Sequence, residues 1–136
     1  MKAREYFRVV SDLFESMVET QTAQIERAAE RCAAAMEEGV AELCRAIAEA
    51  NGLTQDEIVW AIFTVSHDLD ADFPARAARV KGGWDRVPMI CSREIPVPGS
   101  LPRAVRVLVH VDSGSPGDAK HVYLRGAKVL RPDLHK

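Results

Sequence analysis

The sequence predicts an α+β fold, in which a mixed sheet packs against helices and follows a long N-terminal helix or a helical pair. The first observation behind this prediction is a proline-free segment from Lys2 to about Ala50, with one glycine and apolar residues at helical spacing. The second is that short β-branched runs then alternate with a helical pattern and with turn-rich loops. At 136 residues the chain is expected to form a single domain.

An apolar stripe runs along the N-terminal segment with a spacing near 3.5 residues. Gln21 occupies its one polar position, and Gly39 is the only plausible break before the face resumes at Val40. Asn51-Gly52 then supplies a C-terminal cap. Two interpretations stay open: the helix packs against its own sheet, which is commoner, or it has a coiled-coil partner. The stripe consists of Phe7, Val10, Phe14, Met17, Ile25, Ala28, Cys32, Val40, Leu43 and Ile47.

The elements expected after this helix follow from local patterns. Thr54-Gln55-Asp56-Glu57 has the pattern of a capping box, so one helical turn should follow. Ile58 to Val65 is almost continuously apolar and is therefore expected to be a strand buried on both faces. The remaining expectations are a helix that starts at Asp72 and Pro74 and ends at Lys81, strands at Val87–Ser92 and Val105–Val111, a loop at Asp112–Asp118, and segments at His121–Leu124 and Ala127–Leu130 that complete the mixed pattern.

Composition excludes several classes of function. Eighteen Lys and Arg residues against twenty Asp and Glu give a formal charge of -2, so no basic field favours nucleic acid or a membrane surface. Three cysteines without a CxxC pair fit thiols in a reducing cytoplasm, and no apolar stretch has signal or transmembrane length. The four histidines lack the spacing of metal ligands. We therefore expect a cytoplasmic protein without a metal or other cofactor.

Arg106 is the residue most suggestive of chemistry. It lies within the apolar strand Val105-Arg106-Val107-Leu108, where a guanidinium needs an anion or another acceptor. It could equally face solvent or join an internal ion pair, because strands alternate inward and outward. The sequence alone leaves these alternatives open.

Other candidate residues also have ordinary structural interpretations. Glu94 reads as a solvated loop carboxylate, Cys91 as a small buried residue and Tyr123 as a half-buried strand tyrosine. Arg76 and Arg79 are three residues apart on the short helix, where arginines are normally at the surface. A cysteine hydrolase is disfavoured, because the sequence places no histidine beside Cys91.

Several separated motifs, in order and with similar gaps, resemble the trimeric α/β-barrel class of monofunctional chorismate mutases. The resemblance covers roughly the last 85 residues. It is carried by Asn51-Gly52-Leu53, Asp68 to Ala77, Gly83-Trp84, Val87 to Cys91, Glu94, Arg106, His121 to Leu124, and Val129-Leu130-Arg131-Pro132-Asp133-Leu134.

The resemblance implies roles for these residues. Arg106 would contact the ether oxygen of chorismate and one carboxylate, while Glu94 and Cys91 would orient the hydroxyl of the ring. Tyr123 would bind a carboxylate. The segment with Phe73, Arg76 and Arg79 would border the pocket from an adjacent subunit. Leu130 and Arg131 would form its closing wall and C-terminal cover, and Ile90 would also bind the substrate. The resemblance also implies a homotrimer and a cofactor-free isomerase of aromatic amino-acid synthesis.

The N-terminal region departs from this pattern. Members of the family begin with a strand similar to Arg-Gly-x-Arg-Gly-Ala-Thr, whose second arginine grips a substrate carboxylate. Residues 24–31 here are helical in pattern and lack glycine. We therefore divide the single domain, residues 1–136, into an atypical helical leader at 1–39, faintly similar to that of sugar-isomerase-type proteins, and a family-like region at 40–134.

Three functions remain open from the sequence. The first is an active chorismate mutase. The second is a weak or inactive module that binds small anions or oligomerises, because the leader lacks the strand and its arginine. The third is a coiled-coil interaction protein whose N-terminal stripe carries the function.

Overall fold

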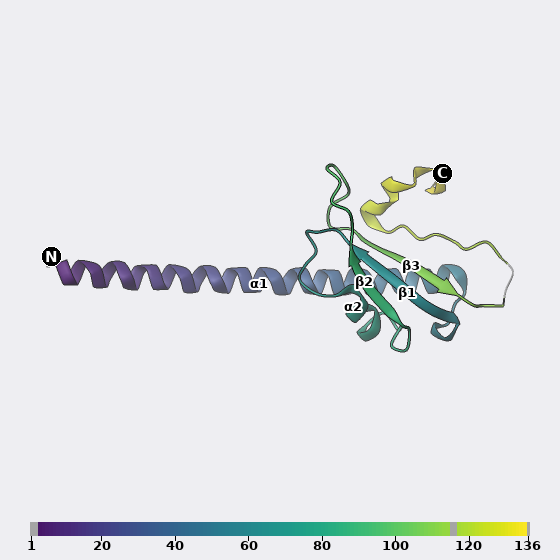
Figure 1. Cartoon of the computed structure of the whole chain (residues 1–136), viewed down its shortest axis with the longest axis horizontal. Helices are drawn as coiled ribbons and strands as arrows, with labels where there is room; N and C mark the ends of the chain where they lie inside the picture. Colours follow the sequence, from purple (N-terminus) through teal and green to yellow (C-terminus); the bar gives the residue numbers. More distant parts are fainter. Residues whose placement is uncertain (1–2, 115–116, 136) are drawn as a thin grey trace.

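The computed structural model describes residues 3–114 and 117–135 as two layers, a three-stranded sheet with two helices packed on one face (Figure 1). The strand order is β2-β1-β3, with β2 parallel and β3 antiparallel to the central β1. The elements are α1 (Ala3–Asn51), β1 (Ile58–Val65), α2 (Pro74–Val80), β2 (Met89–Arg93) and β3 (Val105–Val111), with short 3-10 turns at Gln55–Glu57, Arg125–Leu130 and Pro132–His135. The predicted α+β class is confirmed.

Helix α1 is one continuous helix of 49 residues, so Gly39 does not break it and the single-helix alternative is correct. Its C-terminal half passes behind the sheet, whereas its N-terminal half projects beyond the body of the molecule (Figure 1). Met36, Val40 and Cys44 are buried, but Phe14 and Ile25 on the earlier part of the stripe are 67% and 68% exposed. Packing against the chain's own sheet therefore holds only for the C-terminal half of α1.

The end of α1 shows the predicted cap. Gly52 adopts a positive φ of 62°, a conformation that favours glycine, and the amide of Leu53 donates to the Ala48 carbonyl at 2.9 Å. The Glu57 carboxylate then accepts hydrogen bonds from the backbone amide and the hydroxyl of Thr54 at 2.7 and 2.8 Å. The Thr54 backbone amide, followed by its hydroxyl, lowers the pKa of Glu57, and one 3-10 turn follows as the capping box predicts.

The core lies between the two layers. Ala61 and Phe63 of β1 are buried against α1, α2 and the Trp84 ring, whose centroid is 6.2 Å from that of Phe63. The chain passes so close to α2 at Gly82 that an added Cβ would lie 2.7 Å from the Ala78 carbonyl oxygen. Glycine at this position thus permits the compact turn after α2.

The prediction that β1 is buried on both faces is wrong. Its burial alternates, because the helices cover only one face of the sheet and the described residues leave the other open. We call this second surface the open face. It carries Trp60, Ile62 and Thr64 of β1, Ile90 and Ser92 of β2, and Arg106, Leu108 and His110 of β3. Ile90 and Leu108 are 62% and 64% exposed, so the open face is substantially apolar.

The C-terminal segment after β3 returns along the molecule towards α1 (Figure 1). The sequence predicts that His121–Leu124 and Ala127–Leu130 complete the mixed α/β pattern, but residues 121–124 are irregular and Arg125–Leu130 forms a 3-10 turn. Among the described residues, no helix has the length and apolar character needed to cross a membrane.

Candidate functional site

The open face of the sheet carries an ion pair between Arg106 and Glu94. Arg106 is at the second position of β3, opposite Thr64 of β1, and Glu94 directly follows β2. The Glu94 amide donates to the Val65 carbonyl at 2.9 Å, which continues the parallel ladder and fixes the backbone of this residue. The sheet register thus joins two residues that are twelve apart in sequence.

Thr64 completes this polar group. Its hydroxyl donates to Oε1 of Glu94 at 2.6 Å, while Oε2 of the same carboxylate pairs with Arg106. The Glu94 side chain is only 17% exposed, whereas that of Arg106 is 47% exposed. Since a guanidinium has five N–H donors, Arg106 can remain paired with Glu94 and still offer donors to an anion from the open side.

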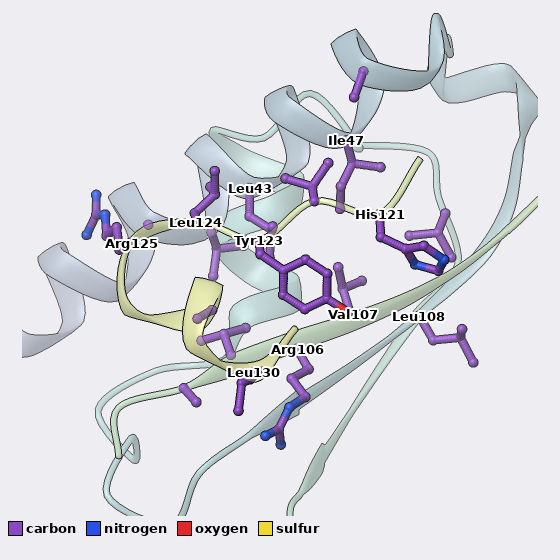
Figure 2. Close-up of a pocket in the computed structure, with 18 of the residues that line it drawn as sticks. Leu43, Ile47, Arg106, Val107, Leu108, His121, Tyr123, Leu124, Arg125 and Leu130 are labelled. Carbon is purple, nitrogen blue, oxygen red and sulfur yellow. The ribbon is translucent and has the colours of Figure 1, made fainter. Parts of the chain in front are cut away.

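Tyr123, Leu130 and Arg131 lie along a groove of about 1820 Å³ between α1, β3 and the C-terminal segment, and Arg106 of β3 also lines this groove. In Figure 2 the Tyr123 ring lies on the α1 side of β3, whereas the Arg106 guanidinium points away from that side. Bonding to Asp133, followed by the charge of that carboxylate, raises the pKa of Arg131, and Tyr123 contributes in the same direction. The tyrosine and Arg131 therefore form one group at the groove, separate from the Glu94 carboxylate.

Two contacts fasten the C-terminal segment to α1. The side-chain nitrogen Nδ2 of Asn51 donates to the Lys120 carbonyl at 3.0 Å, and the side-chain oxygen Oδ1 accepts from the backbone amide of Lys120 at 2.7 Å. Further along, Arg125 pairs with Glu42 at 2.6 Å while its own backbone holds a left-handed φ of 52°. A left-handed non-glycine residue costs about 1 kcal/mol or more, so the surrounding contacts must hold this turn. Tyr123 is thus positioned between two anchors.

Phe73, Arg76 and Arg79 are exposed on and beside α2, in the helical layer. Arg76 pairs with Asp72, whose pKa is lowered first by the Phe73 amide and then by Arg76. Arg79 lies in the last turn of the helix. Because α2 covers the face opposite Arg106, these residues are not brought to the Arg106–Glu94 pair within one chain.

The two candidate residues of β2 divide between the faces of the sheet. Ile90 is opposite Ile62 and is exposed on the open face, beside Trp60 and Met89 in a small apolar pocket of about 300 Å³. Cys91 is opposite Phe63 and packs partly buried against the core. The Cys91 side chain is therefore on the face opposite Arg106, and only its backbone lies in the strand that leads to Glu94.

Sequence reasoning missed Thr64 and the anchors Asn51, Glu42 and Arg125. Thr64 belongs to an apolar strand and looks like a β-former, and only the register shows that it is level with Arg106. The two anchors join residues 69 and 83 positions apart, for which the sequence offers no local signal. In the parts of the chain that the structure describes, no group of three or more His, Cys, Asp or Glu side chains is arranged to hold a metal ion.

Comparisons with known proteins agree on one family. A profile of "Chorismate mutase type I" matches residues 23–134. Chorismate mutase AroH of Thermus thermophilus is 49% identical over 102 residues, which is 74% of this chain and 83% of the relative. Chorismate mutase AroH of Bacillus subtilis is 39% identical over 94 residues, covering 68% of this chain and 74% of the relative.

A solved structure shows the same fold. The chorismate mutase from Clostridium thermocellum superposes with a TM-score of 0.64 at 48% identity. The match covers 70% of this chain and 85% of that one.

Proposed function

Because the chain belongs to the chorismate mutase type I family, we propose that it rearranges chorismate to prephenate at a site centred on Arg106 and Glu94. In this reaction the enol-pyruvyl C–O bond breaks while a C–C bond forms, without a covalent enzyme intermediate. The protein must hold a flexible substrate in a compact shape and stabilise negative charge on the ether oxygen. Neither task calls for a nucleophile or a metal.

The observation that carries the proposal is the Arg106–Glu94 pair, in which Glu94 also accepts a hydrogen bond from the Thr64 hydroxyl. A half-exposed guanidinium, paired with a carboxylate that Thr64 also holds, is a preorganised cation, which is what a developing oxyanion requires. Arg106 would contact the ether oxygen, and Glu94 would orient the hydroxyl of the substrate ring. Tyr123 and Arg131 would bind carboxylate from the groove side, where Leu130 closes the wall.

We further propose that the working site forms between copies of the chain, as a homotrimer. In one chain the candidate residues are spread over the open face, the groove beside Tyr123, which Arg106 also lines, and α2, whose Arg76 and Arg79 are away from both. The open face is apolar at Ile90 and Leu108, and large exposed apolar patches commonly mark subunit interfaces. Packing of this face against a second copy would bring Phe73, Arg76 and Arg79 of one subunit towards Arg106 of another.

Three free cysteines also support a reducing, cytoplasmic location.

The activity is tested by following the loss of the enol-ether absorbance of chorismate with the full chain. Turnover that scales with enzyme concentration supports the proposal, and folded protein without turnover refutes it. Sedimentation of the same sample tests the trimer. Leu108→Asp should leave the monomer folded, because its side chain already faces solvent, but should abolish assembly together with turnover. A variant that stays trimeric would place the interface elsewhere.

A second candidate is a module that binds small anions without catalysis. The observation in its favour is that residues 24–31 belong to α1, where Arg27 and Arg31 are exposed on a helix. Among the described residues, no strand precedes β1 that could carry a second arginine beside Arg106. Loss of one charge-assisted contact would cost roughly 1.5 to 3 kcal/mol of binding. Calorimetric binding of chorismate by folded protein without product formation would favour this candidate over the mutase.

A further inference from the structure

The hydroxyl of Thr64 has a place in the site that goes beyond packing. It donates to Oε1 of Glu94 at 2.6 Å, and the other carboxylate oxygen pairs with Arg106. We propose that Thr64 is a positioning residue, which acts through Glu94 to hold Arg106 in the orientation needed for catalysis. This inference rests on the proposed mutase activity and extends it to a residue on the central strand.

The sheet geometry makes Thr64 suited to this role. It is on β1, the only strand paired on both sides among the described residues, and its neighbours in register are Ser92 of β2 and Arg106 of β3. Glu94, in contrast, directly follows the edge strand β2, and its backbone bond to Val65 fixes the main chain but not the position of the carboxylate. A hydroxyl on the rigid central strand can therefore restrict the carboxylate more strongly than the backbone of Glu94 can.

The ion pair alone would not fix the arginine. The Arg106 side chain is 47% exposed, so solvent competes for its donors, and exposed ion pairs are weakly restrained. With Oε1 held by Thr64, Oε2 keeps a defined position, and the Arg106 guanidinium has one preferred orientation towards it. Preorganisation of this kind lowers the barrier without changing substrate contacts, because it removes reorganisation at the moment of reaction.

The test compares Thr64→Val with Thr64→Ser in the full chain, with wild type assayed first. Valine has nearly the shape of threonine and suits a strand, but lacks the hydroxyl. We expect Thr64→Val to lower kcat about tenfold, with KM changed less than threefold, because hydrogen bonds to charged groups contribute at about this level. Thr64→Ser should recover most of the lost kcat. Melting temperatures of both variants should stay close to that of wild type.

Two further arms separate positioning through Glu94 from a general disturbance of the strand. Ser92→Ala removes a neighbouring hydroxyl that donates to the Arg93 carbonyl at 3.4 Å and should change kcat less than twofold. In a Glu94→Ala background, measured at high enzyme concentration, Thr64→Val should add less than a twofold loss.

The outcomes distinguish failure of the positioning role from failure of the mutase activity. A wild-type chain that turns over chorismate, together with a Thr64→Val variant within twofold of it, overturns the positioning role alone. Equal losses in Thr64→Val and Thr64→Ser, or in Ser92→Ala, also overturn it. A wild-type chain that is folded but inactive refutes the mutase activity itself.

Discussion

Replacing Arg106 by alanine should separate catalysis from stability. The Arg106 side chain is 47% exposed, so its pairing with Glu94 contributes at most about 1 kcal/mol to folding after solvent screening. Glu94 keeps its bond to Thr64 in the variant. The melting temperature should therefore fall by only a few degrees.

The effect on turnover should be much larger. Loss of a preorganised donor at a developing oxyanion costs about 3 to 4 kcal/mol, or roughly 100- to 1000-fold in kcat. The remaining Glu94 carboxylate, only 17% exposed, would also repel the carboxylates of the substrate. Arg106→Lys should give an intermediate loss, because a single ammonium does not reproduce the planar fork that meets Glu94 and an oxyanion together.

The assay is the absorbance of chorismate, measured with thermal melts and sedimentation on the same samples. Arg86→Ala is the matched control, since Arg86 pairs with Asp56 at 2.7 Å on the surface with both side chains mostly exposed. It should keep wild-type turnover. Folded, assembled Arg106→Ala with kcat within tenfold of wild type would show that the key cation has been placed wrongly.

Four further experiments test other parts of the structure. Asn51→Leu removes the hydrogen bonds to Lys120, at 2.7 and 3.0 Å. It should raise KM several-fold and speed proteolysis of the segment after β3, because this segment loses its contact with α1. An unchanged KM would show that this anchor does not shape the site. Burial raises the pKa of Cys44 to about 12, so a thiol reagent at neutral pH should label exposed Cys32 but leave Cys44 unreacted until the protein unfolds; rapid labelling of Cys44 in the native state would contradict its burial. In the unfolded chain the pKa of this thiol is its ordinary value of 9.0, so this part of the stability is present below pH 9.0 and is lost as pH rises towards 12. Thermal melts of Cys44→Ala should therefore show a weaker decline in stability over that interval. Deletion of residues 1–30 should leave a folded, active chain by circular dichroism and turnover, because Met36 is the first buried apolar residue among the described side chains; failure of that shortened chain to fold would show that the projecting half of α1 is part of the folding unit.

Local patterns predicted most of the elements. Helical spacing and the absence of proline predicted α1, and continuous β-branched runs predicted β1 and β3 with the observed bounds. The pattern failed where it depended on neighbours. An apolar run cannot tell whether one or both faces of β1 are covered by the same chain, and heptad-like spacing cannot tell where a helix leaves its own core.

The arrangement of the candidate residues could not be predicted from the sequence. Arg106 is notable in the sequence as a charge within an apolar strand, whereas Glu94 alone is interpreted as a solvated loop carboxylate; the structure pairs the two. Side-chain alternation along β2 predicts that Ile90 and Cys91 face opposite sides of the sheet. Only the register with Ile62 and Phe63 shows that Cys91 is the one that faces the core.

The sequence by itself determined the family and most of the elements, because motifs and propensity are properties of neighbouring residues. Only the tertiary structure decided that Thr64 supports Glu94, that Asn51 and Glu42 anchor the Tyr123 segment, and that the candidate residues divide among three surfaces. These relations join residues far apart in the chain. They are set by strand register and helix packing, which no local window of sequence contains.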